Sequence, residues 1–263
     1  MKWRNIRTVI IQEMYVTKGS WEVILDIFVF SLINIILFGF ISRYLAQSTD
    51  NRVQAQSLLI AVIFWEVIRV NQYSTSVSSM WNVWSHNLSN MFIAPIRVTE
   101  YLAAHVLAAT VKSFTIFVTA VLFAKYAFHL NMFGLGLFPL AFSYLNMVIF
   151  ATAIGLVLVG FVFQFGTRVQ ALSWGVIYFV QPFSAVFFPI SILPAFLQPI
   201  GYGIPVTYFF EWLRALHAGV GYEASKVMGA FCLNIIFLVV GCYIFSRQLA
   251  AAKRSGQLVR NDL

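Results

Sequence analysis

The chain has 263 residues, of which 60% are hydrophobic and only 10% are charged, 17 basic against 9 acidic. Ordinary soluble domains carry roughly 25% charged residues, so this sequence has too few charges to cover a water-soluble fold. Intrinsic disorder is excluded as well, because disordered segments need low hydrophobicity. The composition predicts an all-α integral membrane protein. We attribute the net charge of +8 to basic cytoplasmic tails and expect no nucleic-acid partner.

Residues 1–22 predict an amphipathic helix that lies on the membrane surface and contacts its lipids. The apolar residues of one face recur at helical spacing: Trp3, Ile6, Ile10 and Met14. The opposite face carries the charged residues Lys2, Arg4 and Glu13. Such a pattern is typical of interfacial helices, and a solvated lead-in is the alternative.

Six later segments are long enough to cross a bilayer, which needs about 20 mostly apolar residues per helix. They are residues 23–45, 57–79, 101–124, 137–163, 169–188 and 227–246. Both the N-terminal tail and the tail 247–263 are basic, so the positive-inside rule places both in the cytoplasm. That arrangement requires an even number of spans. We therefore expect six transmembrane helices in a single domain, residues 1–263.

A seventh apolar stretch, within residues 189–226, is interrupted by prolines. Pro189, Pro194, Pro199 and Pro205 recur every five or six residues, and each removes a backbone donor. We predict short re-entrant helices that dip into the membrane from the outer side and pack against protein.

The same outer segment contains three polar candidates, Tyr208, Glu211 and Arg214. Glu211 and Arg214 are three residues apart, which places them on one face of a helix. A surface ion pair is the favoured interpretation for these two residues.

Glu66, Arg69 and Lys112 fall inside predicted spans, where a charge costs at least about 2.5 kcal/mol on insertion scales. Glu66 and Arg69 are three residues apart and can pair on one helix face, and Lys112 could join them. This patch would either lie on a substrate path or between protomers, or it would be a structural ion pair that locks adjacent helices. Both interpretations stay open.

The sequence shows no phosphate loop, no metal-ligand spacing and no pair of nucleophile and base. We therefore predict no catalytic site and no cofactor in this chain. Residues 80–100 form a different kind of feature, an amphipathic segment on the cytoplasmic side between the second and third spans. It is either a membrane-surface tether or a docking element for a cytoplasmic partner.

Two sets of motifs resemble the type-2 ABC exporter permeases, the membrane subunits of polysaccharide, lipid and drug exporters. In the segment 80–100, the similarity lies in Asn87-Leu88, Ala94-Pro95-Ile96 and Glu100. In the outer segment, it lies in Phe188–Ile200, Pro205–Tyr208 and Leu213-Arg214. The sequence departs from the family pattern at Ile204, where the family usually has Asn. The resemblance covers nearly the whole chain.

The resemblance implies a multi-pass permease of the bacterial cytoplasmic (inner) membrane that exports an amphipathic lipid-linked glycan, lipid or drug. Two permeases, as a homo- or heterodimer, would work with two copies of a separate nucleotide-binding ATPase, which would bind ATP and Mg. The segment 80–100 would be the coupling helix. We expect the ATPase contact at Asn87, Leu88, Met91, Ile93 and Pro95, although the apolar members can also simply bury themselves in the bilayer interface.

Two other classes remain as alternatives. An ion- or proton-coupled secondary carrier would use Glu66, Arg69 and Lys112 as its relay. An intramembrane enzyme or an assembly scaffold is the third possibility.

Overall fold

The protein is represented by a computed structural model that describes residues 2–85 and 96–256, and this part of the chain contains helices and no strands. Five helical segments are long and apolar enough to cross a membrane: Trp21–Ser48, Arg52–Trp84, Val98–Phe128, Leu137–Phe183 and Ala224–Arg254. The all-α prediction is therefore confirmed for the described residues, with five such segments where the sequence predicts six.

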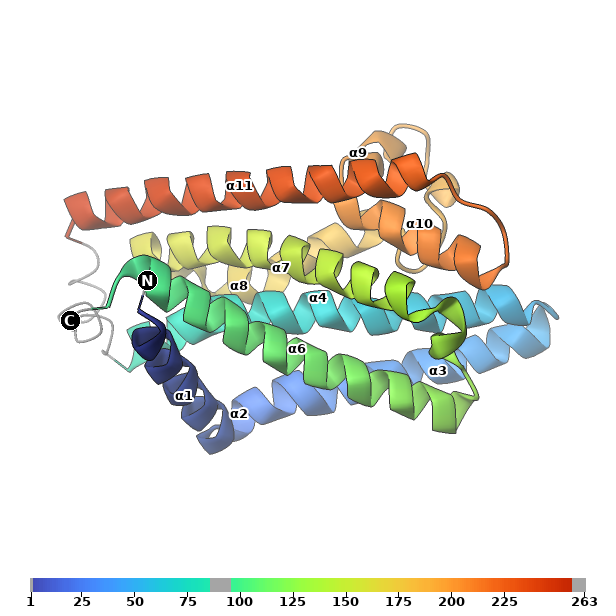
Figure 1. Cartoon of the computed structure of the whole chain (residues 1–263), viewed down its shortest axis with the longest axis horizontal. Coiled ribbons are helices and arrows are strands. Elements are labelled where there is room, and N and C mark those ends of the chain that lie inside the picture. The colour runs from blue at the N-terminus through green and yellow to red at the C-terminus, as the bar shows by residue number, and fades with distance from the viewer. Residues whose placement is uncertain (1, 86–95, 257–263) are drawn as a thin grey trace.

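The long helices run side by side along the long axis of the molecule (Figure 1). They are α3 (Phe30–Ser48), α4 (Arg52–Trp84), α6 (Val98–Phe128), α7 (Leu137–Phe165) and α11 (Ala224–Arg254). α4 lies at the centre, in contact with α3, α6 and α7, while α11 packs along α7. The start of α1 and the end of α11 lie at the same end of the bundle (Figure 1).

The difference in the number of segments arises between α7 and α8 (Gln170–Val180). The chain reverses there through a short 3₁₀ turn, Gly166–Val169, and Gly166 has a φ of 61° that glycine adopts without steric cost. α8 has only 11 residues, or about 16 Å of helix, which is roughly half of a bilayer core. The single apolar segment Leu137–Phe183 therefore contains the fourth predicted span and most of the fifth.

α4 remains helical although many of its buried residues are polar. Hydroxyl groups on this helix donate to carbonyls one turn back, from Thr75 to Asn71 at 2.9 Å and from Ser76 to Gln72 at 3.0 Å. Such bonds satisfy polar side chains inside an apolar bundle without a partner from another helix. α4 can therefore bring further polar residues, among them Glu66 and Arg69, to the centre of the protein.

Residues 189–226, for which we keep the name outer segment after their predicted side, consist of short pieces between their prolines. The 3₁₀ turn Gln181–Phe183 precedes this segment, and the 3₁₀ turn Ile190–Ile192, α9 (Gln198–Tyr202) and α10 (Pro205–His217) lie within it. Pro199 and Pro205 lie in the first turns of α9 and α10, where a missing N–H costs nothing. α10 packs against α4, α7 and α11 at the end of the bundle opposite the start of α1 (Figure 1).

The N-terminal helix α1 (Trp3–Gly19) packs against α6. Its buried face consists of Ile6, Val9 and Glu13, whereas Trp3 and Met14 are 67% and 61% exposed. The prediction that placed Glu13 on the outward polar face is therefore wrong. The reason is a buried basic partner on α6, which is described below.

Candidate functional site

Arg69 organises a polar cluster between α4 and the first apolar segment, Trp21–Ser48. Its Nε donates to Glu66 at 2.9 Å, and its Nη2 donates to the Ser31 hydroxyl at 2.7 Å and to the Asp26 carbonyl at 3.1 Å. Its Nη1 lies 3.8 Å from the Asp26 carboxylate. Glu66 also accepts a hydrogen bond from Asn34 at 2.6 Å. Glu66 and Arg69 thus form the pair that their spacing predicts, within a larger network.

Asp26, Ser31 and Asn34 were not among the residues that the sequence singled out. Asp26 lies in a π-helical turn, Leu25–Val29, which follows the short helix α2 (Trp21–Ile24). Single π turns inside longer helices are frequent at functional sites. The available signal was the acidic residue inside the first predicted span, since an ionisable residue at such depth is a candidate site by default.

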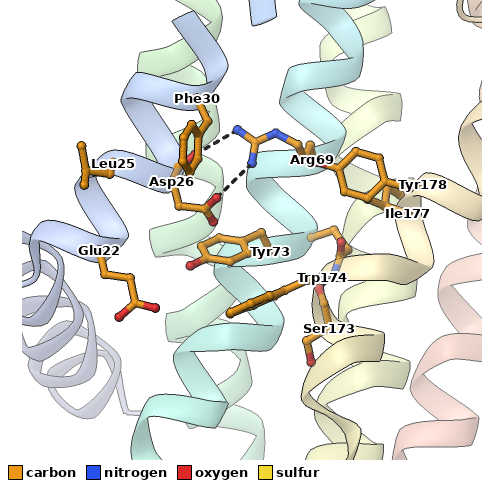
Figure 2. A pocket seen from close by; sticks show the side chains of 11 residues that line it. Glu22, Leu25, Asp26, Phe30, Arg69, Tyr73, Ser173, Trp174, Ile177 and Tyr178 are labelled. Atoms are coloured by element: carbon orange, nitrogen blue, oxygen red, sulfur yellow. Dashed lines mark hydrogen bonds and ion pairs between the residues drawn. The ribbon is translucent and has the colours of Figure 1, made fainter. Parts of the chain in front are cut away.

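This cluster borders two neighbouring cavities of about 530 Å³ and 420 Å³. Both are lined by Asp26, Phe30, Arg69 and Tyr178, and we call the two cavities together the groove. Figure 2 shows the larger cavity, with Glu22 and Asp26 on one side, Trp174 and Tyr178 from α8 on the other, and Arg69 and Tyr73 from α4 between them. The groove is therefore a space between the first apolar segment and α8, with α4 as its floor.

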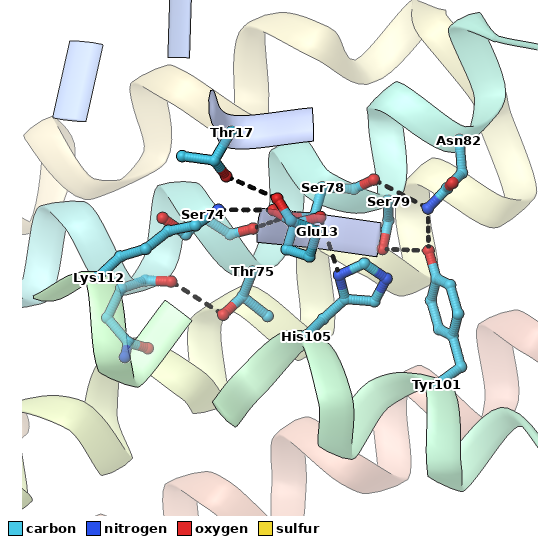
Figure 3. Close-up of polar contacts among 11 residues, drawn as sticks. Glu13, Thr17, Ser74, Thr75, Ser78, Ser79, Asn82, Tyr101, His105 and Lys112 are labelled. Atoms are coloured by element: carbon cyan, nitrogen blue, oxygen red, sulfur yellow. Dashed lines mark hydrogen bonds and ion pairs between the residues drawn. The ribbon is translucent and has the colours of Figure 1, made fainter. Parts of the chain in front are cut away.

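A second cluster of charges fastens α1 to the bundle, and we call its four residues, Glu13, Ser78, His105 and Lys112, the clamp. Glu13 accepts hydrogen bonds from Lys112 and from Ser78, both at 2.6 Å, and the His105 ring lies 3.6 Å from its carboxylate (Figure 3). Glu13 and Lys112 are only 6% and 9% exposed. Lys112 therefore pairs with α1 and does not join Glu66 and Arg69.

The clamp leaves almost no free space around its ion pair. The cavity that touches Glu13 and Lys112 measures about 10 Å³, which is at most the room that one water molecule needs. A carboxylate and an ammonium group in such surroundings neutralise each other directly. The clamp thus holds α1 in place and offers no room for a ligand.

Glu100 provides a second attachment between α1 and α6. Its carboxylate accepts from the backbone N–H of Lys2 at 2.6 Å and from the Asn5 side chain at 2.8 Å. It also accepts from the backbone N–H of Arg97 at 3.2 Å, which caps the start of α6. The beginning of α1 is therefore tied to the beginning of α6.

The five predicted ATPase-contact residues, Asn87, Leu88, Met91, Ile93 and Pro95, lie outside the described residues. The helices before and after them, α4 and α6, end and begin at the end of the molecule where α1 starts (Figure 1). α6 begins at Val98, so Glu100 and its bonds to α1 follow this segment within a few residues.

In the outer segment, Glu211 and Arg214 form an ion pair of 3.2 Å, but their role exceeds that of a surface pair. Glu211 accepts from the backbone N–H of Ile190 at 2.9 Å, and Arg214 donates to the carbonyl of Ala185 at 2.8 Å. Burial lowers the pKa of Arg214, while the nearby Glu211 carboxylate acts in the opposite direction. The pair therefore fastens the stretch around Pro189 to α10.

Two further hydrogen bonds and one close approach fix the short helices of this segment. The Tyr208 hydroxyl donates to the carbonyl of Tyr202 at 3.0 Å. A Cβ at Gly201 would lie 2.8 Å from the carbonyl oxygen of Phe183 and 2.7 Å from a side-chain carbon of Ile190, so only glycine fits there. Pro194 accepts the backbone N–H of Leu197 at 2.8 Å in the turn before α9.

The family described as ABC-2 family transporter protein matches residues 72–246, which is 175 of the 263 residues. No curated protein matches the chain. The matched region begins within α4 and ends within α11, so it includes Lys112 and the outer segment, whereas Glu13, Glu66 and Arg69 precede it. The chain therefore belongs to the ABC-2 family of transporter proteins and is a multi-pass membrane permease.

Proposed function

We propose that the chain is the membrane-spanning subunit of an ATP-driven exporter, which moves an amphipathic substrate out of the cytoplasm. The observation that carries the proposal is the family match over residues 72–246. ABC-2 family membrane proteins typically work with ATPase partners. In this assignment a separate ATPase, in two copies, binds ATP and Mg and hydrolyses the nucleotide.

The groove is the proposed route for the substrate, and a second permease copy, identical or related, is its proposed outer wall. The support is that the groove lies at the side of a single chain, where Phe30 and Tyr178 on its rim are largely exposed. A two-fold assembly is the commonest arrangement of soluble oligomers, and it would enclose two such grooves face to face. A single chain offers only one half of a closed path.

Both tails are assigned to the cytoplasmic side of a bacterial inner membrane. The support is the cluster of basic residues at the end of the bundle where α1 begins and α11 ends, including Arg4, Arg7, Lys253 and Arg254, as the positive-inside rule expects. An even number of crossings follows if α8 and the turns that flank it form the fifth passage.

The segment 86–95 is assigned to the ATPase contact, through Asn87, Leu88, Met91, Ile93 and Pro95. The support in the described residues is the neighbouring attachment of α1 to α6 through Glu100. A force on this segment would reach α6 and α1 together. Replacing Leu88 or Met91 with Glu should uncouple ATP hydrolysis from transport while expression stays intact, and unchanged transport would contradict the assignment.

The deciding experiment is reconstitution of the chain with an ATPase that copurifies with it, followed by measurement of substrate export with and without ATP. We expect export to require ATP and to stop with a hydrolysis-deficient ATPase, used as the matched control. Transport that persists without ATP and collapses with the proton gradient would contradict the proposal. It would favour the secondary carrier that the sequence offers as the alternative, although Lys112 pairs with Glu13 and not with Glu66 and Arg69.

A further inference from the structure

We propose that the groove recognises the positively charged group of its substrate, so that the exported molecule is an organic cation with an apolar body. The inference rests on the proposed function for the direction of transport only, because binding to the groove can be measured without ATP. Three features carry it, namely the charge of the lining, the engagement of Arg69 and the aromatic side chains.

The lining of the groove is net negative. The charged residues that line its two cavities are three carboxylates, Glu22, Asp26 and Glu66, and one guanidinium, Arg69. Their formal charges leave an excess of two negative charges. Because charges interact more strongly where the dielectric constant is low, this excess favours a cation in the groove and disfavours an anionic group.

Arg69 is not free to bind an anion. Its nitrogens are engaged by Glu66, by the Ser31 hydroxyl and by the backbone and side chain of Asp26. Glu66 in turn is completely buried and is shared between Arg69 and Asn34. The innermost charges of the groove are therefore already neutralised.

Two carboxylates are less tightly engaged. The Asp26 side chain is 26% exposed, lies 3.8 Å from Arg69 and is hydrogen-bonded to the Tyr73 side chain, so it keeps part of its surface for a ligand. Glu22 lies at the surface end of the same cavity, and it has no ion-pair partner in the part of the chain that the structure describes. Together they form an acidic wall of the larger cavity.

Aromatic rings face this wall. Trp174 and Tyr178 from α8 lie across the cavity from Glu22 and Asp26, with Tyr73 of α4 between the two sides (Figure 2). A cation within about 6 Å of a ring centre is attracted by the ring, and Trp is the strongest of the aromatic residues in this respect. Carboxylates on one side and rings on the other can together replace the hydrating water around an ammonium or phosphonium group.

The groove also has room for the rest of such a molecule. Its larger cavity, about 530 Å³, falls within the roughly 300–1,000 Å³ of small-molecule sites.

Two probes of nearly the same shape and opposite charge test the inference, namely tetraphenylphosphonium and tetraphenylborate. Equilibrium binding of each is measured to the full chain in nanodiscs of a zwitterionic lipid without ATP, after subtraction of binding to empty nanodiscs. We expect the cation to bind at least about tenfold more tightly than the anion. Equal affinities, or tighter binding of the anion, would overturn the inference.

Variants locate the site. Asp26→Asn and Trp174→Leu should each weaken binding of the cation by about tenfold, whereas the exposed Glu223→Gln at the other end of the bundle is the matched control and should change nothing. Glu22→Lys should weaken the cation and strengthen the anion, and it keeps the inference testable if Asp26→Asn fails to fold. Cation binding that none of the groove variants changes would overturn the site.

The two proposals can fail separately. A chain that binds the cation in the groove but shows no ATP-driven transport upholds this inference and contradicts the exporter assignment. A chain that exports another amphiphile with ATP, but prefers the anion or ignores these substitutions, upholds the exporter and overturns the cation site.

Discussion

The clamp and the groove use the same chemistry in different surroundings. The clamp pairs Glu13 with Lys112 at 2.6 Å, beside a space of about 10 Å³. The groove pairs Glu66 with Arg69 at 2.9 Å, beside cavities of about 530 Å³ and 420 Å³. The two pairs differ little in geometry, but they differ greatly in the room beside them.

This difference teaches that a buried ion pair by itself is weak grounds for assigning a function. Such pairs often add little net stability, yet removing one partner is costly because the other charge stays buried. Where the space is closed, as at the clamp, the pair can only hold helices together. Where the space is open, as in the groove, the neighbouring charges can also meet a ligand.

The largest effect is expected from breaking the clamp on one side. Glu13→Leu leaves the Lys112 ammonium buried without its partner, so it should lower the free energy of unfolding by about 3–5 kcal/mol. Denaturant unfolding in mixed micelles measures this, with the exposed Glu223→Leu as the matched control. A loss of less than about 1 kcal/mol for Glu13→Leu would mean that Lys112 is hydrated and that the clamp is not closed.

A matched pair of serine substitutions compares the two surroundings directly. Ser78→Ala removes a donor to Glu13 in the clamp, and Ser31→Ala removes an acceptor of Arg69 beside the groove. We expect Ser78→Ala to cost about 1–3 kcal/mol, the usual penalty for a buried unsatisfied group. Ser31→Ala should cost less, because water in the cavities can reach Arg69.

The same unfolding measurement on the two variants tests this order. Equal costs, or a larger cost for Ser31→Ala, would show that the space beside Arg69 does not replace a lost hydrogen bond. The comparison between a closed clamp and an open groove would then no longer hold.

Neutralising both partners of the clamp should have a smaller effect on stability than breaking it on one side. Glu13→Gln with Lys112→Met removes both buried charges, so its free energy of unfolding should lie within about 1–2 kcal/mol of the unsubstituted chain. Unfolding of the double variant beside Glu13→Leu measures the recovery. A double variant as unstable as the single one would indicate that the loss comes from packing rather than from an unpaired charge.

The smallest effect concerns pH and lies outside both clusters. Burial lowers the pKa of His217, whose ring contacts Gln56 at 3.2 Å. Because the fold favours the neutral ring, its contribution is present above the unfolded pKa, about 6.5, and is lost as the pH falls through the folded pKa. His217→Gln should therefore lose slightly less stability between about pH 7.5 and about pH 5 than the unsubstituted chain.

Melting temperatures of the two proteins at both pH values measure this difference. His217 belongs to neither the clamp nor the groove. Its contribution to the pH dependence of stability can therefore be subtracted when these two regions are compared at different pH values. A larger acid loss in His217→Gln than in the unsubstituted chain would contradict the direction given.

Local patterns in the sequence were sufficient to predict several features of the structure. The four regularly spaced prolines predict the broken outer segment, because each proline acts on its own helical turn. The pairing of Glu66 with Arg69 follows from a spacing of three residues on one helix. Long apolar runs predict α3, α4, α6, α7 and α11. The predicted ends of these helices differ from the observed ends by about two helical turns at most.

Other features depend on contacts between distant segments. Glu13 and Lys112 are 99 residues apart, so their pairing follows only from the packing of α1 on α6. Asp26 meets Arg69 because a π turn and the crossing of two helices bring them together. The shortness of α8 depends on the turn at Gly166 and on the 3₁₀ turn that follows α8, which hydropathy alone does not reveal.

The most direct test of the account is ATP-driven export by two neutral double variants, measured side by side in proteoliposomes with the copurifying ATPase. One carries Glu13→Gln and Lys112→Met in the clamp, and the other carries Glu22→Gln and Asp26→Asn, which remove the two carboxylates that the groove offers to a ligand. We predict export close to that of the unsubstituted chain for the clamp variant and a loss of about tenfold or more for the groove variant, equivalent to about 1.4 kcal/mol. Normal export by the groove variant, at equal amounts of folded protein, would contradict the claim that the groove is the substrate route.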